Sequence, residues 1–219
     1  MNPIITIAIL LVILGIVAVY LILRPPTPEL DTSAPRSSDA ESDDRGESLQ
    51  RLAALISEDN QSVATEIELF IERRQDYFDT FQDDLSNRNI ESVDKITPEI
   101  ALIDALEKSS SLAYWDGSHE PDEALAHLDQ LSSGALKELP SYSEFEDYYG
   151  SARYGIGEYL DGDGDWPSLF DLVEESGLAL MAINEKSDSY AIFLVDLSDR
   201  QLVAQLAESA GIAIFYADK

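Results

Sequence analysis

Residues 178–195, LALMAINEKSDSYAIFLV, contain the pattern that decides the fold class. Two short apolar runs, at 178–184 and 190–195, are compatible with β-strands and are joined by five polar residues. Apolar runs of this length with a short polar connection are typical of a β-hairpin. We therefore expect a pair of antiparallel strands near the C-terminal end of the chain.

The residues after the hairpin predict a helix and a last strand. Residues 198–201, SDRQ, have the spacing of a capping box, in which the Ser and Gln side chains satisfy free backbone N–H groups. Gly211 is placed to end this helix, because glycine readily adopts the left-handed conformation found just past a helix C-terminus. A final strand would follow at 212–216.

The chain before the hairpin predicts mostly helix. Apolar residues recur at steps of three, four and seven between Val63 and Leu85, which indicates one amphipathic helix of about six to seven turns. Residues 97–99, TPE, supply an N-cap, a proline at the first helical position and an acid for another helix. A short helix would hold 49–56, and a further one would begin at Pro121. The predicted helices come first along the chain and the few predicted strands come later. This order predicts an α+β fold with a small, mainly antiparallel sheet in the C-terminal half.

The N-terminal residues predict a membrane anchor. Residues 3–23, PIITIAILLVILGIVAVYLIL, carry no charge, and a helix of this length spans about 30 Å, the thickness of the hydrocarbon core. A cleaved signal peptide fits less well, because no Lys or Arg precedes the run and no small-residue cleavage pattern follows it. We expect a single-pass anchor at 1–24 that contacts the lipid bilayer. Arg24 on the C-terminal side favours a cytoplasmic domain.

Residues 25–48 predict a disordered linker. They are rich in Pro, Ser and Asp, and no large apolar residue lies between Leu30 and Leu49. Such a segment cannot bury enough surface to offset the entropy of ordering it. We therefore expect an acidic α+β domain at 49–219, joined by this linker to the anchor at 1–24.

The chain is strongly acidic, with 43 Asp and Glu against 14 Lys and Arg and a formal net charge of −29. Affinity for nucleic acid comes mainly from Lys and Arg, so the charge argues against a nucleic-acid partner. The absence of cysteine excludes Cys-ligated zinc, iron–sulfur clusters and thiol nucleophiles. A protein partner with a basic surface fits the charge, and so does adaptation to high salt without any partner.

A loop of alternating acids and glycines is the one candidate metal site, formed by Asp161, Asp163 and Asp165. These carboxylates could converge on Ca²⁺, which takes about six to eight oxygen ligands. The calcium-loop pattern needs Gly and Glu where this chain has Trp166 and Leu172. An acidic turn near the N-terminus of the next helix is the alternative.

Motifs of catalysis are missing. The two histidines, His119 and His127, form no metal-binding pair, and the chain has no Gly-x-Ser-x-Gly or phosphate-binding GK[ST] motif. We interpret His119 as a polar loop residue and His127 as a helix-surface residue. We therefore expect that the protein is not an enzyme and needs no cofactor. The alternative is a metal-dependent hydrolase that uses the acidic loop.

Aromatic residues gather between Tyr142 and Tyr159, with acids interleaved. Tyr and Trp give rigid, amphipathic contact area and are common at protein interfaces. The alternative is that half of these rings pack beneath an irregular loop. The residues that we expect to contact a partner are Trp115, Asp116, Tyr148, Tyr149, Asp188 and Tyr190.

Several short strings resemble a bacterial family known as a domain of unknown function (six-six-three-zero type). They are AYWD at 113–116, EPDE at 120–123, GLAL at 177–180 and KSDSY at 186–190. The resemblance covers roughly residues 98 to 217. It implies an α+β fold and no catalytic residue, and it does not cover the anchor, which we expect in the inner membrane of a bacterium.

A second likeness, through LPSY at 139–142 and Phe145, is to immunity-type domains related to yeast cell-wall regulators. It makes a toxin-neutralising protein an alternative function, since acidity complements a cationic toxin. The first hypothesis remains a membrane-anchored module that binds a protein partner, because a tether raises the concentration of a domain near other membrane proteins.

Overall fold

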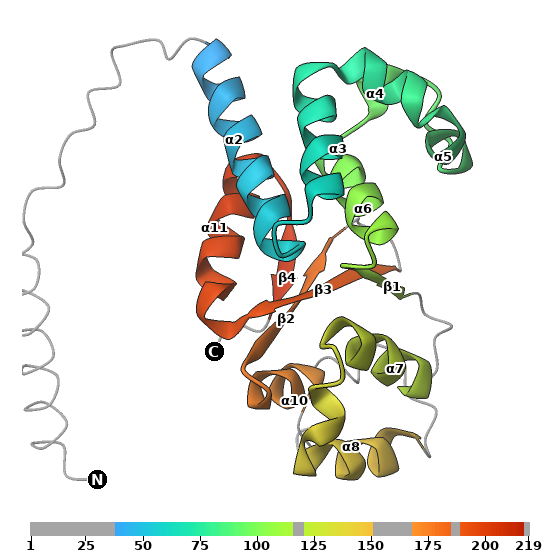
Figure 1. The fold of residues 1–219 in the computed structure, drawn as a ribbon, viewed down its shortest axis with the longest axis vertical. Coiled ribbons are helices and arrows are strands. Elements are labelled where there is room, and N and C mark those ends of the chain that lie inside the picture. The colour runs from blue at the N-terminus through green and yellow to red at the C-terminus, as the bar shows by residue number, and fades with distance from the viewer. Residues whose placement is uncertain (1–37, 116–120, 151–167, 185–188, 217–219) are drawn as a thin grey trace, which may run out of the picture. The chain divides into compact units, whose positions relative to one another are not determined.

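The structure, a computed structural model, describes residues 38–115, 121–150, 168–184 and 189–216 (Figure 1). Helices and a four-stranded sheet make up this part of the chain. The predicted anchor at 3–23 lies outside it. Among the described helices, none combines the length and the apolar character that a membrane span requires.

The sheet is antiparallel throughout, with the strand order β1-β3-β2-β4. Its strands are β1 (Ala113–Trp115), β2 (Leu178–Ile183), β3 (Tyr190–Asp196) and β4 (Ile214–Tyr216). The pairing of β2 with β3 confirms the predicted hairpin, and β4 confirms the predicted last strand. Strand β1 was not predicted, because it has only three residues and comes from the mainly helical part of the chain.

The two central strands are apolar on both faces. Side chains alternate across a strand, so Ala179 and Met181 of β2 join one buried cluster while Leu180 and Ala182 join another. Both clusters need a cover of helices, because neither face of the sheet is polar. The sheet is therefore the middle layer of the fold.

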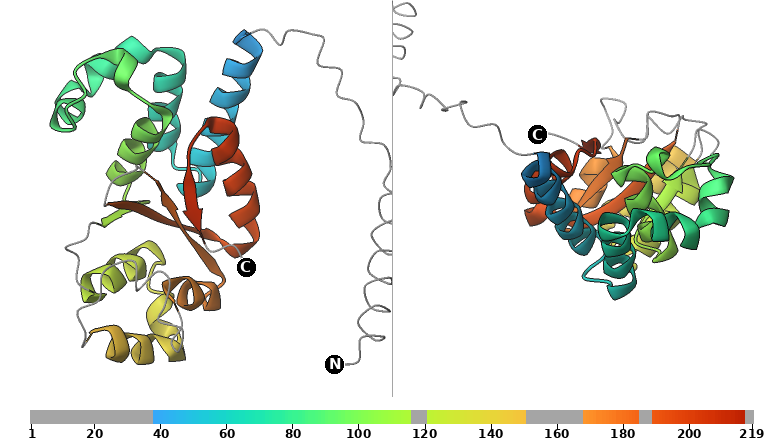
Figure 2. Two further views of the ribbon diagram at one scale, coloured as in Figure 1. Left: turned by 180° about the vertical axis from the view of Figure 1, so that it is seen from behind. Right: turned by 90° about the horizontal axis from the view of Figure 1, so that it is seen from above.

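Helices cover both faces of the sheet (Figure 2). One face carries α2 (Ser38–Ile56), α3 (Gln61–Glu72), α6 (Pro98–Lys108) and α11 (Arg200–Ala210). The other carries α7 (Pro121–Leu131), α8 (Pro140–Gly150) and α10 (Leu169–Glu175). Short 3₁₀ turns lie at Val93–Lys95, Leu136–Glu138 and Leu197–Asp199. The α+β class is confirmed.

Helix α2 begins at Ser38, well inside the segment predicted as a disordered linker. The prediction was wrong for the described end of that segment. The C-terminal part of α2 is held in the core by the buried side chains of Leu49, Leu52 and Ile56. Once this part is formed, extending the helix toward the N-terminus adds one hydrogen bond for each residue that is fixed. Acids near a helix N-terminus also interact favourably with its dipole. The helix can therefore continue without large apolar residues in its first turns.

The predicted long helix between Val63 and Leu85 is wrong, because the chain turns twice within it. Helix α3 is followed by α4 (Arg74–Thr80) and α5 (Gln82–Asn87), with Arg73 at φ −139° and ψ 63° between the first two. A straight helix would extend roughly 35 Å and carry its last apolar side chains away from the core. The turns instead leave Tyr77 and Leu85 fully buried, and the ring of Tyr77 lies 5.6 Å from that of Phe70.

Two of the predicted helix ends are confirmed, and one predicted capping box is wrong. The Thr97 side chain accepts a hydrogen bond from the Ile100 N–H as α6 begins, and Gly211 ends α11 at φ 82°. The predicted capping box at Ser198 is absent, since Asp199 precedes α11 with helical angles and makes no side-chain cap. The extended backbone that a cap requires occurs instead at Ser168, before α10.

Ser168 and Asp171 form the capping box that the structure contains. The Asp171 N–H donates to Ser168 Oγ at 3.2 Å, and the Ser168 N–H donates to Asp171 Oδ2 at 2.9 Å. Ser168 is buried and Asp171 is partly buried, so the two bonds are partly shielded from water.

We expect Ser168→Ala to lower the free energy of unfolding by about 1 kcal/mol, because it removes the acceptor of the Asp171 N–H. Ser198→Ala is the matched control and should cost less than about 0.5 kcal/mol, since Ser198 caps no helix. Urea unfolding followed by tryptophan fluorescence measures both. Equal losses in the two variants would contradict this placement of the capping box.

Candidate functional site

Trp115, predicted to contact a partner, is a core residue. Its side chain is fully buried in the cluster shared by α7, α8 and α10. The indole N–H donates to Nδ1 of His127 at 3.1 Å. This bond also corrects the interpretation of His127 as a simple surface residue. Trp115 therefore offers no surface to a partner.

The other predicted contact residues form no single surface in the described part of the chain. Tyr148 and Tyr190 are half-buried and pack against the same cluster as Trp115. The segment that holds Tyr142, Phe145 and Tyr148 is helix α8 instead of an irregular loop, and the rings of Tyr142 and Phe145 are buried. Outside the described residues or side chains lie Asp116, Tyr149, Asp188, Asp161, Asp163 and Asp165.

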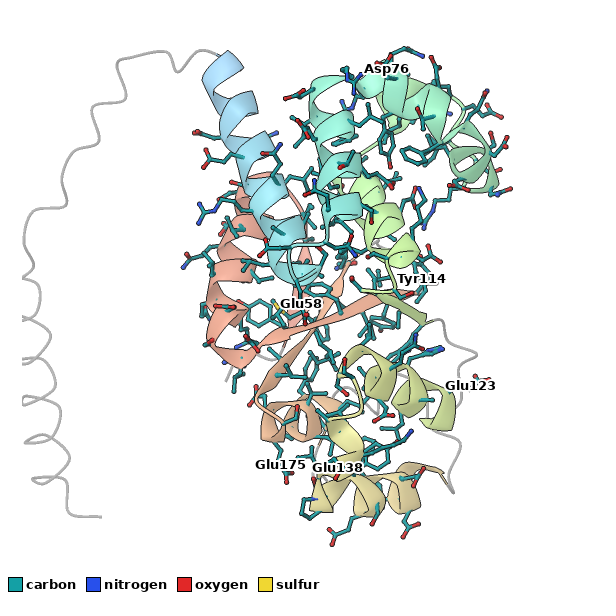
Figure 3. All side chains as sticks on the ribbon, in the orientation of Figure 1. Glu58, Asp76, Tyr114, Glu123, Glu138 and Glu175 are labelled. Carbon is teal, nitrogen blue, oxygen red and sulfur yellow. The ribbon has the colours of Figure 1, made fainter. Side chains whose placement is uncertain are left out.

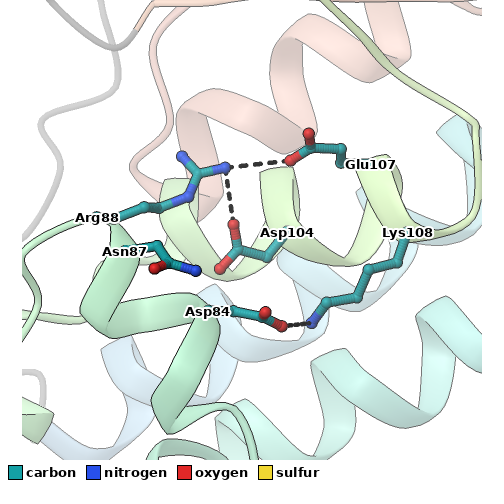
Figure 4. A pocket seen from close by; sticks show the side chains of 6 residues that line it. All are labelled: Asp84, Asn87, Arg88, Asp104, Glu107 and Lys108. Atoms are coloured by element: carbon teal, nitrogen blue, oxygen red, sulfur yellow. Dashed lines mark hydrogen bonds and ion pairs between the residues drawn. The ribbon is translucent and has the colours of Figure 1, made fainter.

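A pocket between α5 and α6 gathers charged side chains that the sequence did not single out (Figure 4). It has a volume of about 490 Å³ and opens to solvent. Its lining residues are Asp84, Asn87, Arg88, Asp104, Glu107 and Lys108. Helix α6 supplies three of them at positions 104, 107 and 108, because residues three and four apart share one face of a helix.

Asp104 is the buried centre of this pocket. It is only 4% exposed, since it lies among the apolar residues of α6 that pack into the core. Its Oδ1 lies 2.9 Å from a guanidinium nitrogen of Arg88, which also donates to Glu107 Oε2 at 3.3 Å. The second oxygen, Oδ2, has no hydrogen-bond partner. A buried acceptor without a donor is costly and rare in proteins.

Lys108 lines the pocket next to Asp84 and links three helices. Its Nζ lies 2.9 Å from Glu66 Oε1 of α3 and 3.4 Å from Asp84 Oδ2 of α5. The same nitrogen lies 3.7 Å from the centre of the Phe81 ring, at a distance typical of cation–π contact. Glu66 Oε1 also accepts a hydrogen bond from the buried Tyr77 hydroxyl at 3.4 Å. The turns after α3 and α4 bring these groups together.

Comparison with known proteins identifies the family. The model of the family Domain of unknown function (DUF6630) matches residues 48–217. The chain belongs to this family. Comparisons with curated proteins and with solved structures gave no match.

The pocket lies wholly within the part of the chain that the DUF6630 family model matches. The match begins at Ser48, inside α2, and extends past β4. It therefore covers both helical layers and the whole sheet, while the predicted anchor lies outside it. The family resemblance seen in the sequence is confirmed, and it extends further toward the N-terminus than residue 98.

Burial raises the pKa of Asp104 in this DUF6630 domain to about 6 from its usual value of 3.8. The cations Arg88 and Lys108 oppose this change, and the carboxylates Glu66 and Glu107 add to it. Burial likewise raises the pKa of the Tyr77 hydroxyl far above its usual value, with help from the charge of Glu66. Asp104 thus exchanges a proton near neutral pH, while Tyr77 keeps its proton and acts as a hydrogen-bond donor.

One signal in the sequence points to this site. Asp104 is the single charge in the run ALIDAL at 101–106, and Asp is almost never fully buried unless it is paired. Arg88 has no comparable signal, because it reaches Asp104 only through the turns that follow α3. Among the described residues, no group of three His, Asp or Glu side chains is arranged to hold a metal ion. The pocket offers hydrogen-bond acceptors and donors, and one of its three carboxyl groups, that of Asp104, has a pKa raised to about 6.

The stability of the domain should depend on the protonation of Asp104. Because the folded state raises the pKa of Asp104 from 3.8 to about 6, it binds the proton more tightly than the unfolded state does. The contribution of this carboxyl to stability is therefore full below pH 3.8 and is lost as the pH rises through 6. We expect Asp104→Asn, which does not titrate, to become more stable relative to wild type by about 1 kcal/mol between pH 5 and pH 7.

Urea unfolding at a series of pH values measures this difference. Asp83→Asn is the matched control, because Asp83 is exposed on α5 and does not line the pocket. It should reproduce the pH dependence of the wild-type chain. A constant difference between Asp104→Asn and wild type across this range would contradict the prediction.

Proposed function

We propose that the protein is a single-pass, membrane-anchored module that binds a protein partner through a basic surface of that partner. The observation that carries this proposal is the excess of carboxylates, 43 against 14 cationic side chains. An excess of this size creates a negative field that attracts cationic proteins and repels nucleic acid and anionic lipid.

The folded domain pairs several of its cations with its own carboxylates, and these pairs leave its net negative charge unchanged. Five described cations lie 2.6 to 3.4 Å from a carboxylate oxygen. They are Arg73, Arg88, Lys108, Lys137 and Arg200, which pair with Asp76, Asp104, Glu66, Asp129 and Glu174. These cations are therefore neutralised within the domain, and the surplus carboxylates are left to face solvent.

The surplus carboxylates lie on many elements of the domain (Figure 3). Exposed examples are Glu58, Glu138 and Glu175. Among the described residues, the large apolar side chains that are exposed are Leu202 and Phe215. Contact with a partner would therefore be driven mainly by charge, and salt would weaken it.

The predicted anchor at 3–23 supports the membrane part of this proposal. Tethering confines the domain to a layer near the membrane, which raises its effective concentration for partners in that layer. Arg24 favours a cytoplasmic domain by the positive-inside rule. Cytosolic and inner-membrane proteins are then the partners within reach.

We expect crosslinking in intact cells to capture a basic protein with the full chain. Cells that express residues 1–37 alone are the control, because they keep the anchor and lack the folded domain. The captured protein, once purified, should bind the full chain at low ionic strength and lose about tenfold or more in affinity at 0.5 M salt. Equal capture by residues 1–37, or no capture together with stability that rises steeply with salt, would contradict the proposal and favour adaptation to high salt.

We expect a cysteine placed at Ser37 to be protected in intact cells. The chain has no cysteine of its own, so a membrane-impermeant maleimide would report this position alone. Labelling should appear only after lysis if the domain is cytoplasmic. Labelling of intact cells with a permeabilised outer barrier would reverse the orientation, and partners would then be sought outside the membrane.

A further inference from the structure

The pocket between α5 and α6 contains an acceptor that no protein donor satisfies. Asp104 is more than nine-tenths buried, yet its Oδ2 has no hydrogen-bond partner, and the residue lines the pocket. Leaving a buried acceptor without a donor costs about 1–3 kcal/mol. A ligand that brings an N–H group to Oδ2 would remove this cost.

The charges around Asp104 favour a cation as that ligand. Four carboxylates surround two cations, which leaves two negative charges in excess when all are ionised. Each cation is already held by two carboxylates: Arg88 by Asp104 and Glu107, and Lys108 by Glu66 and Asp84. An anion would meet the excess negative charge, whereas a cation would neutralise it.

The arrangement suits an organic cation better than a metal ion. Among the described residues, no three potential ligands are placed to hold a metal. A guanidinium or ammonium group carries several directed N–H donors. Its donors can meet the exposed carboxylates of Asp84 and Glu107, which line the same pocket, and one donor can reach Asp104 Oδ2 once the side chains that cover this buried atom move aside.

We propose that this pocket receives the cationic head of an arginine or lysine side chain from the partner, with Asp104 Oδ2 as its central acceptor. This inference rests on the proposed function, and it names the place where a basic partner is recognised. Arginine should bind more tightly than lysine, because its planar fork serves two carboxylates at once.

Recognition of a cation at Asp104 should depend on pH. With its pKa at about 6, Asp104 is mostly protonated at pH 5 and must release that proton to bind a cation. Affinity should therefore rise about tenfold from pH 5 to pH 7. The charged and titratable groups that face Asp104 are Glu66 of α3, Tyr77 of α4, Asp84 of α5, Arg88, and Glu107 and Lys108 of α6.

Titration of the full chain in mild detergent tests this inference. The probe is a peptide in which arginine alternates with glycine, compared with its lysine analogue and its uncharged citrulline analogue. We expect the order arginine, lysine, citrulline, with at least a tenfold loss for citrulline. Asp104→Asn should weaken arginine binding about tenfold and remove its dependence on pH.

Asp83→Asn is the matched control, since it removes one exposed negative charge from α5 without touching the pocket. Glu107→Gln is a second pocket variant at an exposed position, and it should weaken binding while the fold is kept. Unfolding curves of each variant check that the domain is intact.

The outcomes separate this inference from the proposed function. Binding of the arginine peptide that is equally weakened in Asp104→Asn and Asp83→Asn would overturn the pocket and leave the basic partner standing. Failure of the wild-type chain to bind any cationic peptide would count against both. Free argininamide that binds as tightly as the peptide would overturn the assignment to a partner's side chain, because a small amine would then be the ligand.

Discussion

Strands β2 and β3 are apolar on both faces, and the helices that cover the sheet are placed by the need to bury them. Ala179, Met181 and Phe193 contribute to one cluster, and Leu180 and Ile192 to the other. A sheet with two apolar faces is stable only between two layers of helices. The chain meets this need by laying four helices on one face and three on the other.

The parts of the fold that were predicted correctly depend on neighbouring residues. Thr97 caps α6, Gly211 ends α11 and the hairpin joins two apolar runs, and each of these signals lies within a few residues of its effect. The break at Arg73 has no such signal. The turn lets the buried Tyr77 ring fold back against Phe70 of α3, so side-chain packing overrides a periodicity that continues through the turn.

The candidate site illustrates the same limit. Trp115 has the chemistry of an interface residue, but large aromatic side chains fill cores as readily as interfaces. Its hydrogen bond to His127 depends on how β1 meets α7, which a sequence alone does not provide. Asp104 was visible as a charge within an apolar run. Its ion-pair partner Arg88 comes next to it only when α4 and α5 turn back toward α6.

Short edge strands also affect how copies of the domain behave when they crowd together. The two edge strands, β1 and β4, have three residues each, while the central strands have six and seven. An edge of three residues presents few unpaired backbone groups as a template for a neighbouring sheet. Strong like charge further opposes close approach of two copies. Edge-to-edge aggregation is therefore disfavoured even at a high density of molecules on one surface.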